Sequence, residues 1–480
     1  MRNRISFLQN AVFIYLFHFC LCININAQEL PAIFTNGMVL QQNTEVAVWG
    51  SAGANTVVKI KTGWNQKMYE ATSDSSGYWQ VEISTPEGGF NEYDITITGD
   101  KTIKIEKVLI GEVWLSSGQS NMQMPVKGKL NQPIKNGMEI LMEAANPYIR
   151  LFEIERNSVL EPAQDVQGLW KESTVSTVRE FSAIASVFGK ILFNKLEVPV
   201  GLIGSYWGGS SVDAWMSENA LENYPSLSPS IPENQEKSAN HTPTGLYNGM
   251  IEPIQPYEIK GVIWYQGESD RNRHKLYANF FSDMIQSWRN EWGNEDLSFY
   301  YAQIAPYAYD GSNRSAFLRE AQLQTIDRLP NVGMAVTMDI GEEFNIHPAD
   351  KITVAERLSY LALAKTYGVE GLPYAGPVYH SKDIQEGKII VTFDHAPNGL
   401  TTFGEPLTGF KIAGADKVFY EAEAKIINRN GDTGIEVWND FVSDPKEVRY
   451  CFEDWCEGSL YNTEGLPASS FRTDHWDEVK

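Results

Sequence analysis

A unit of apolar strand, polar turn and amphipathic helix recurs from about Val108 onward, and this pattern limits the folds open to the chain. Five apolar runs are predicted as strands: Val108–Leu115, Val198–Gly204, Gly261–Tyr265, Ser298–Ile304 and Gly333–Met338. The segment Arg273–Trp292 is predicted as a helix, because apolar side chains recur on one of its faces. They are Leu276, Phe280, Met284, Ile285 and Trp288. Alternating strands and helices predict an α/β fold, a mostly parallel sheet covered on both faces by helices, whose active sites lie at the carboxyl ends of strands.

Shorter alternating runs flank this α/β region on both sides. Before it, runs such as Glu45–Trp49 and Tyr93–Ile97 are separated by Gly-, Asn- and Ser-rich turns, which is typical of an antiparallel β-sandwich. After the predicted helix Ala349–Tyr367 the β pattern returns. Because 480 residues exceed the usual size of one domain, several domains are expected. They are an N-terminal β-sandwich over residues 28–105, the α/β domain over residues 106–370, and a C-terminal β module over residues 371–480 packed on it.

The first 27 residues are predicted to be an export signal. Arg2 and Arg4 form a basic start, the apolar stretch Phe13–Phe17 follows, and Ala27 offers a small residue at the cleavage site. The alternative is a membrane anchor, but polar residues interrupt the apolar run, which is shorter than the roughly 20 residues of a helical span. We therefore predict cleavage after Ala27, no membrane span afterwards, and a periplasmic or secreted protein.

Charge and cysteine content narrow the possible partners and cofactors. The formal charge is −22, and no basic stripe offers a phosphate-binding surface, so nucleic acid is not expected as a partner. In an exported chain, Cys451 and Cys456 form either a small local disulfide or a pair of buried thiols. No histidine cluster shows the spacing of a metal site, so neither a metal nor another cofactor is expected.

Polar, glycine-containing turns follow several of the predicted strands. Ser120 lies in the first, where a tight strand-to-helix turn would present its hydroxyl above the sheet edge as a nucleophile. The alternative is an ordinary helix N-cap. The second turn contains paired glycines ending at Gly209, whose backbone N–H could donate to a substrate. The third contains Gln266 and Glu268, an amide donor and a carboxylate.

The fourth turn supplies a candidate base. A serine nucleophile needs a neighbour that titrates near neutral pH, and histidine meets that requirement. Of the seven histidines, only His347 follows a predicted core strand by a short loop rich in carboxylates. A surface histidine is the alternative. We therefore predict that Ser120 and His347 meet at the carboxyl edge of the sheet.

Six short motifs, taken together, resemble the sialate O-acetylesterase family. They are Gly118–Met122, Trp207–Ser210, Leu246–Ile251, Trp264–Ser269, Leu318–Gln322 and Ile346–Pro348. Their order and spacing match, and the end of the chain is similar as well, so the resemblance runs from about Glu29 to Trp476. The family belongs to the SGNH hydrolases. The resemblance therefore implies a three-layer, flavodoxin-like parallel sheet and a serine esterase that removes O-acetyl groups from carbohydrates.

The resemblance also implies residue roles. Ser120 matches the nucleophile and His347 the base, while the oxyanion would be met by the N–H groups of Ser120 and Gly209 and by the side-chain amide of Gln266.

One position departs from the pattern of the wider superfamily, which usually carries an Asp three residues before the His. Here that position is Phe344, so the acid that orients His347 stays open. Asp339 and Glu268 are preferred, and Glu342, Glu343 and a backbone carbonyl are the alternatives.

Aromatic faces that stack on sugar rings, and side chains that bind hydroxyls or a carboxylate, are the candidates for substrate binding. They are Trp207, Trp215, Tyr247, Asn248, Arg319 and Glu320. Arg319 is the first choice for the carboxylate of a sialic acid, followed by Arg271, and a purely structural ion pair is the alternative. The expected partner is an O-acetylated sugar or sialoglycan. Acetylated xylan or xyloglucan is the alternative substrate, and a non-catalytic carbohydrate-binding protein is the alternative function.

Overall fold

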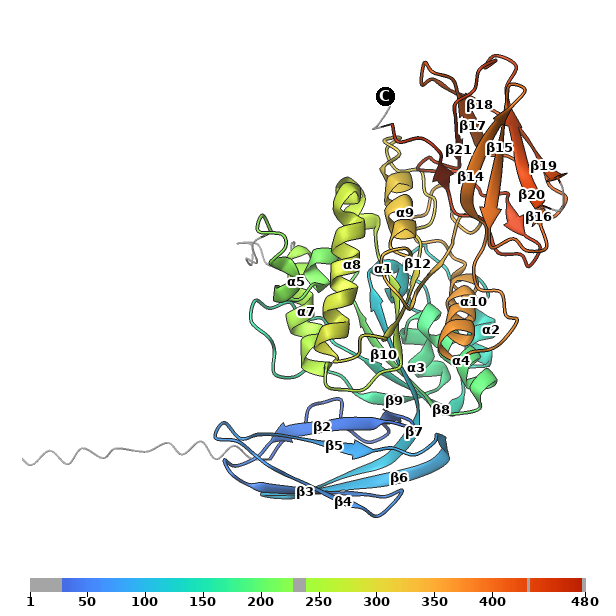
Figure 1. Ribbon diagram of the computed structural model, residues 1–480. Coiled ribbons are helices and arrows are strands. Elements are labelled where there is room, and N and C mark those ends of the chain that lie inside the picture. The colour runs from blue at the N-terminus through green and yellow to red at the C-terminus, as the bar shows by residue number, and fades with distance from the viewer. Residues whose placement is uncertain (1–27, 228–238, 430–431, 477–480) are drawn as a thin grey trace, which may run out of the picture.

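The computed structural model describes residues 28–227, 239–429 and 432–476, so the predicted export signal lies outside the described residues. One mixed sheet crosses the molecule in the order β13-β12-β11-β7-β10-β8-β9. Its strands are β13 (Val332–Ala335), β12 (Ser298–Ala302), β11 (Gly261–Tyr265), β7 (Thr102–Gly118), β10 (Val200–Tyr206), β8 (Asn146–Glu153) and β9 (Trp170–Ser173). All are parallel except β9, which is antiparallel to β8. All five predicted strands are present, and β8 and β9 extend the sheet on one side (Figure 1).

Helices pack on both faces of this sheet. The α-helices are α1 (Ser120–Gln123), α2 (Gly137–Met142), α3 (Val175–Glu180), α4 (Ala183–Leu196), α5 (Glu218–Leu221), α7 (Gly245–Met250), α8 (His274–Glu291), α9 (Arg314–Gln324) and α10 (Lys351–Leu361). Short 3₁₀ segments are η1 (Val212–Trp215), η2 (Ala239–His241), η3 (Glu252–Ile254) and η4 (Glu268–Arg273), and the π-helical turn η5 (Ala362–Thr366) continues α10.

Strand β11 shows how the two faces are covered. Val262 and Trp264 belong to one apolar cluster together with side chains of α8, whereas Ile263 and Tyr265 belong to a second cluster with side chains of α4 and α10. This alternation follows from the two-residue repeat of a strand. The predicted helix Arg273–Trp292 is present as α8, and its predicted apolar face is buried except for Leu276, which is 45% exposed.

The N-terminal strands are continuous with the central sheet. Strands β1 (Val39–Gln41) and β6 (Gly89–Thr98) pair with the first part of β7, followed outward by β3 (Val57–Thr62) and β4 (Met68–Thr72). A separate pair is formed by β2 (Glu45–Ser51) and β5 (Tyr78–Ser84). Most of these pairings are antiparallel, as predicted, but β1 is parallel to β7. The second half of β7 continues into the central sheet and ends directly before α1.

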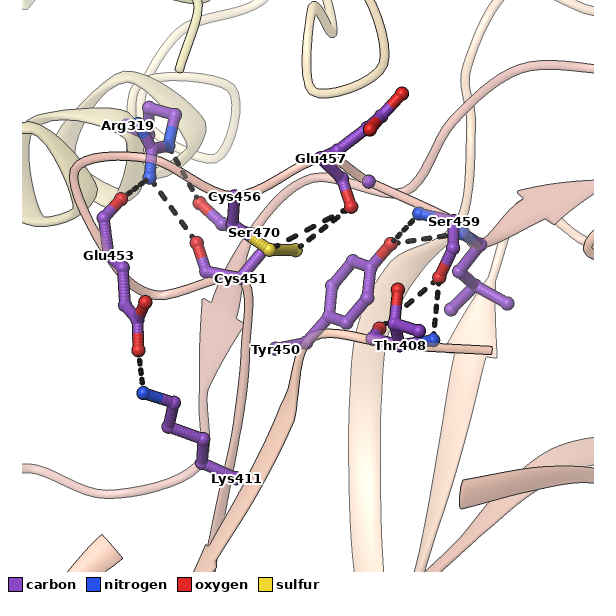
Figure 2. The surroundings of a disulfide bond; sticks show 12 residues. Arg319, Thr408, Lys411, Tyr450, Cys451, Glu453, Cys456, Glu457, Ser459 and Ser470 are labelled. Atoms are coloured by element: carbon purple, nitrogen blue, oxygen red, sulfur yellow. Dashed lines mark hydrogen bonds and ion pairs between the residues drawn. A yellow bond between two sulfur atoms is a disulfide. The ribbon is translucent and has the colours of Figure 1, made fainter. Parts of the chain in front are cut away.

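Additional sheets lie at the C-terminal end, on the side of the molecule opposite the N-terminal strands (Figure 1). One contains β14 (Val378–Gln385), β15 (Lys388–Asp394), β20 (Asp432–Trp438) and β19 (Glu423–Arg429). A second contains β18 (Phe419–Glu421), β17 (Phe410–Ala413), β21 (Glu447–Tyr450) and β23 (Phe471–Arg472), and a short pair is β16 (Leu400–Thr401) with β22 (Tyr461–Asn462). Cys451 and Cys456 form a disulfide directly after β21 (Figure 2).

Candidate active site

Ser120 and His347 meet at the carboxyl edge of the central sheet. Ser120 is the first residue of α1, directly after β7, and His347 lies in the loop between β13 and α10. The Nε2 atom of His347 lies 2.7 Å from the Oγ atom of Ser120. The fold therefore brings together two side chains that are 227 positions apart in the sequence, in the geometry of a nucleophile and its base.

The hydrogen bond made by the other ring nitrogen, Nδ1, determines which nitrogen of His347 can act as a base. Nδ1 lies 3.1 Å from Oε1 of Gln132. An amide oxygen only accepts hydrogen bonds, so Nδ1 carries the proton and Nε2 is left to accept from the serine hydroxyl. Burial, together with the nearby charges of Lys351 and Lys129, lowers the pKa of His347 to about 4. The imidazole is therefore neutral at neutral pH, as a base must be.

Neither preferred acid occupies the Nδ1 side of His347, so the expectation that Asp339 or Glu268 orients the ring is corrected here. The two carboxylate oxygens of Asp339 accept from the guanidinium of Arg357, each at 2.7 Å. Glu268 is buried and accepts from Asn121. Gln132 was not singled out from the sequence, because a lone glutamine between two turns carries no local signal of its role.

A buried polar network joins the Ser120 turn to the His347 loop. The Nδ2 group of Asn121 donates to Oε1 of Glu268 at 2.5 Å and to the carbonyl oxygen of Ile346 at 3.1 Å. The Oδ1 atom of Asn121 accepts from Nζ of Lys351 at 2.6 Å. Burial lowers the pKa of Lys351 to about 7 and raises the pKa of Glu268. Asn121, which follows the serine, thus holds the residue that precedes His347.

Two backbone N–H groups are placed to receive an oxyanion. The N–H groups of Ser120 and Gly209 make no hydrogen bond within residues 28–227, 239–429 and 432–476. Gly209 has a φ of +74°, and the N–H of the preceding Gly208 donates to Oε1 of Gln123 at 3.2 Å. A Cβ atom at Gly208 would lie 3.3 Å from Cβ of Ser120, so this backbone closely approaches the serine. The pair resembles an oxyanion hole at a helix start.

Gln266 does not have a free amide, which corrects its predicted role as a third oxyanion donor. The side chain is fully buried, and its Nε2 group donates to the carbonyl oxygen of Ser210 at 3.0 Å and to Oδ2 of Asp270 at 2.5 Å. Because an amide nitrogen carries two hydrogens, both are used. Gln266 instead stabilises the loop that carries Gly209, through its hydrogen bond to Ser210.

Four of the side chains predicted to contact a sugar differ in their exposure: one is accessible, and the other three are buried. Trp207 is half-buried, and the guanidinium of Arg156 lies 5.6 Å from the centre of its ring. Trp215 is fully buried. Tyr247 is buried as well, and its hydroxyl accepts from Gln255 at 2.6 Å. Asn248 is buried and donates to the carbonyl oxygen of Leu160 at 2.5 Å. Of these four, only Trp207 remains available to a sugar.

Arg319 and Glu320 lie at the junction with the C-terminal sheets, which corrects their predicted substrate role. Arg319 is fully buried. Its guanidinium donates to Oγ of Ser470 at 3.0 Å, to the carbonyl oxygen of Cys451 at 3.3 Å, and to that of Glu453 (Figure 2). Glu320 forms a two-point ion pair with Arg472, at 2.8 and 2.9 Å. Both side chains serve packing between α9 and the C-terminal part of the chain.

The second choice for a carboxylate partner, Arg271, stacks on an aromatic ring. Its guanidinium lies 3.5 Å from the centre of the Tyr309 ring. Within the described residues, no group of three or more His, Cys, Asp or Glu side chains is placed to hold a metal ion. No helix of that same part of the chain is long and apolar enough to cross a membrane.

Comparison with known proteins shows the family to which the chain belongs. Residues 110–360 match the family described as carbohydrate esterase, sialic acid-specific acetylesterase. The chain is 32% identical to a sialate O-acetylesterase of Rattus norvegicus over 72% of this chain and 74% of the relative, and 33% identical to that of Homo sapiens over 73% of each. A carbohydrate acetylesterase from Xanthomonas citri superposes with a TM-score of 0.84 at 34% identity, covering 94% of this chain and 100% of the other. The chain therefore belongs to the sialic acid-specific acetylesterase family of carbohydrate esterases.

Proposed function

We propose that the chain is a serine esterase that removes O-acetyl groups from carbohydrates, sialic acids among them, through an acetyl-enzyme on Ser120. The observation that carries this proposal is the 2.7 Å contact between Nε2 of His347 and Oγ of Ser120, made by a neutral imidazole. Family membership supports the class of reaction.

The reaction would run in two halves. Nε2 of His347 takes the hydroxyl proton as Oγ of Ser120 bonds to the acetyl carbon, and the N–H groups of Ser120 and Gly209 receive the oxyanion. The bond to the sugar oxygen then breaks, and that oxygen takes the proton from His347. In the second half His347 takes one proton from water as the water oxygen bonds to the acetyl carbon. The bond to Oγ of Ser120 then breaks, Oγ takes the proton from His347, and acetic acid leaves and ionises to acetate in solution.

The direct test is acetate release by the purified protein, wild type beside Ser120→Ala and His347→Ala. O-acetylated sialic acid and acetylated xylo-oligosaccharides serve as parallel substrates. We expect both substitutions to lower turnover by roughly 10⁴-fold or more, since removing one member of such a pair disables it. Acetate release that survives in both variants would refute the proposal. Sugar binding without acetate release by the wild type would favour the non-catalytic alternative.

Export is a further part of the proposal. It is supported by the basic and apolar start of the sequence and by the Cys451–Cys456 disulfide, since disulfides persist in oxidising compartments. The expected product begins at Gln28 and is found in the periplasm or medium. Mass spectrometry of the N-terminal peptide from fractionated cells tests this, and an intact leader in the cytoplasmic fraction would contradict it.

A further inference from the structure

The backbone of His347 is contacted by two side chains of its own loop, Asn345 and Glu342. The Oδ1 atom of Asn345 accepts from the N–H of His347 at 3.1 Å, and its Nδ2 group donates to the carbonyl oxygen of His347 at 2.8 Å. Nδ2 also donates to Oε2 of Glu342 at 2.9 Å. Both hydrogens of the Asn345 amide are therefore used, and this one side chain holds both backbone polar groups of His347.

Glu342 extends these contacts past His347. Its second carboxylate oxygen, Oε1, accepts from the N–H of Ala349 at 2.7 Å. Pro348 lies between His347 and Ala349 and has no N–H. Asn345 and Glu342 together therefore take every backbone N–H of this three-residue segment. The acceptor for Ala349 is a carboxylate, and hydrogen bonds to charged acceptors are the stronger ones.

The same segment lies against the part of the chain that carries Gln132. The N–H of Lys135 donates to the carbonyl oxygen of Ala349 at 2.9 Å, and Nζ of Lys135 donates to Oδ2 of Asp350 at 2.9 Å. Gln132, three positions before Lys135, contacts Nδ1 of His347. The position of Ala349 therefore affects the contact between Gln132 and the imidazole ring as well.

A fixed backbone limits where the imidazole ring can lie. The backbone sets the direction of the Cα–Cβ bond, after which only χ1 and χ2 of His347 remain free. The contacts of the two ring nitrogens with Ser120 and Gln132 define these angles, so neither nitrogen is left for a carboxylate. Glu342, an alternative acid in the sequence analysis, contacts the backbone instead. Phe344, three residues before His347, is 84% exposed and has no side-chain acceptor.

We propose that Asn345 and Glu342 are positioning residues for His347, which hold its backbone so that the ring meets Ser120 without a carboxylate at Nδ1. The inference rests on the proposed esterase function, in which His347 is the base. Both side chains act through His347 and not on the reacting atoms.

The first test is steady-state kinetics with 4-nitrophenyl acetate. Asn345→Ala removes the three hydrogen bonds of the amide. We expect kcat to fall by about ten- to a hundredfold, because small misplacements of a reacting group are costly. KM should change by less than about twofold, since His347 serves both halves of the reaction and slows both.

Glu343→Gln is the matched control. It removes a carboxylate of the same loop whose side chain makes no hydrogen bond or ion pair with the residues that the structure describes. The carbonyl oxygen of Glu343, which accepts from the N–H of Ala308 at 3.0 Å, is not altered by the substitution. We expect kcat within about twofold of the wild type. An equal loss in Glu343→Gln and Asn345→Ala would overturn the proposal.

The second test exchanges the two partners. In Asn345→Asp, two carboxylates would face each other across the contact with Glu342, and kcat should fall by about ten- to a hundredfold. Adding Glu342→Gln restores a donor to that contact, so the double variant should be about tenfold faster than Asn345→Asp alone. Independent effects would instead multiply. A double variant no faster than Asn345→Asp would count against the proposal.

Hydrogen–deuterium exchange provides a test that does not depend on activity. In Asn345→Ala, peptides that cover residues 340–350 should exchange about tenfold faster than in the wild type, because the N–H of His347 loses its acceptor. Exchange there should be unchanged in Glu343→Gln, and exchange elsewhere should match the wild type in both variants. Faster exchange throughout Asn345→Ala, with a lowered melting temperature, would assign Asn345 to folding and overturn its positioning role.

These readouts separate the positioning proposal from the esterase proposal. Loss of 4-nitrophenyl acetate hydrolysis in Ser120→Ala and His347→Ala tests the esterase alone. If both variants lose activity and Asn345→Ala behaves as Glu343→Gln does, the positioning proposal fails while the esterase stands. If the wild type hydrolyses no ester, the esterase proposal fails, and the positioning role fails with it.

Discussion

At the scale of single residues, an amide contacts the proposed base at the position where many serine hydrolases use a carboxylate. The carbonyl oxygen of Gln132 holds Nδ1 of His347, which selects the tautomer that a base requires. A neutral acceptor stabilises the imidazolium less than a carboxylate does. Burial and the charge of Lys351 act in the same direction, so the ring stays neutral over a wide pH range.

This arrangement predicts how activity depends on pH. Because the pKa of His347 is lowered to about 4, the base is already unprotonated at pH 5 and becomes protonated only as the pH falls through about 4. The acid limb of kcat/KM for 4-nitrophenyl acetate should therefore lie near pH 4, measured over a range where circular dichroism shows the protein folded. A limb near pH 6.5, the usual value for histidine, would contradict the prediction.

A second prediction separates a positioning role from a triad role for Glu268. Since Glu268 acts on the site through Asn121, Glu268→Gln keeps an acceptor for that amide and should lower kcat by less than about tenfold. Asn121→Ala should lower kcat by about ten- to a hundredfold, because it frees the His347 loop and leaves Lys351 without this acceptor. KM should change little in either variant.

Steady-state kinetics compare kcat and KM of the two variants with those of the wild type. Thermal unfolding is the control that both variants are folded. A loss of about 10⁴-fold in Glu268→Gln would instead mark Glu268 as the direct partner of the base.

At the scale of elements, the end of β7 and the turn after β10 must pack closely to form the site. Gly118 has a φ of +125°, and a Cβ atom there would lie 2.3 Å from the carbonyl oxygen of Tyr265, so the strand-to-helix turn depends on glycine. On the neighbouring turn, Gly208 lies against Ser120 and Gln123. The sheet therefore positions Ser120, the proposed nucleophile, by close contact between backbones.

Gly208→Ala tests this contact. The added Cβ would lie 3.2 Å from Oε1 of Gln123 and 3.3 Å from Cβ of Ser120, a tight fit that needs a small shift of one of them. We expect kcat to fall by about tenfold or more, since small misplacements of reacting groups are costly, while the melting temperature changes by only a few degrees. Unchanged turnover would show that the site tolerates a displaced serine turn.

At the scale of the whole molecule, α9 and the C-terminal sheets are joined through Arg319 and Glu320. Arg319→Met removes a buried guanidinium and leaves the carbonyl oxygens of Cys451 and Glu453 without their donor. We expect the free energy of unfolding to fall by about 3 kcal/mol, measured by denaturant unfolding, with KM for sialylated substrates unchanged below the transition. A raised KM at unchanged stability would instead indicate that Arg319 binds the substrate.

Arg319 also shows where prediction from the sequence reaches its limit. The strands and the Ser120–His347 pair could be anticipated, because apolar runs and the polar turns after them are local features of the sequence. The burial of Arg319 depends on Ser470 and on carbonyl groups more than 130 positions away, and no local pattern reports such partners. The same holds for Gln132, whose role arises only once the fold places it at His347.

The central claim, an acetyl-enzyme on Ser120, is tested most directly by trapping it. The purified protein is mixed with 4-nitrophenyl acetate, quenched in acid within the first turnovers, digested, and mapped by mass spectrometry. The account predicts one acetyl group on the peptide that contains Ser120, absent from Ser120→Ala and scarcely formed in His347→Ala. Turnover that persists in Ser120→Ala, or an acetyl group found on another residue that turns over at the rate of the reaction, would contradict it.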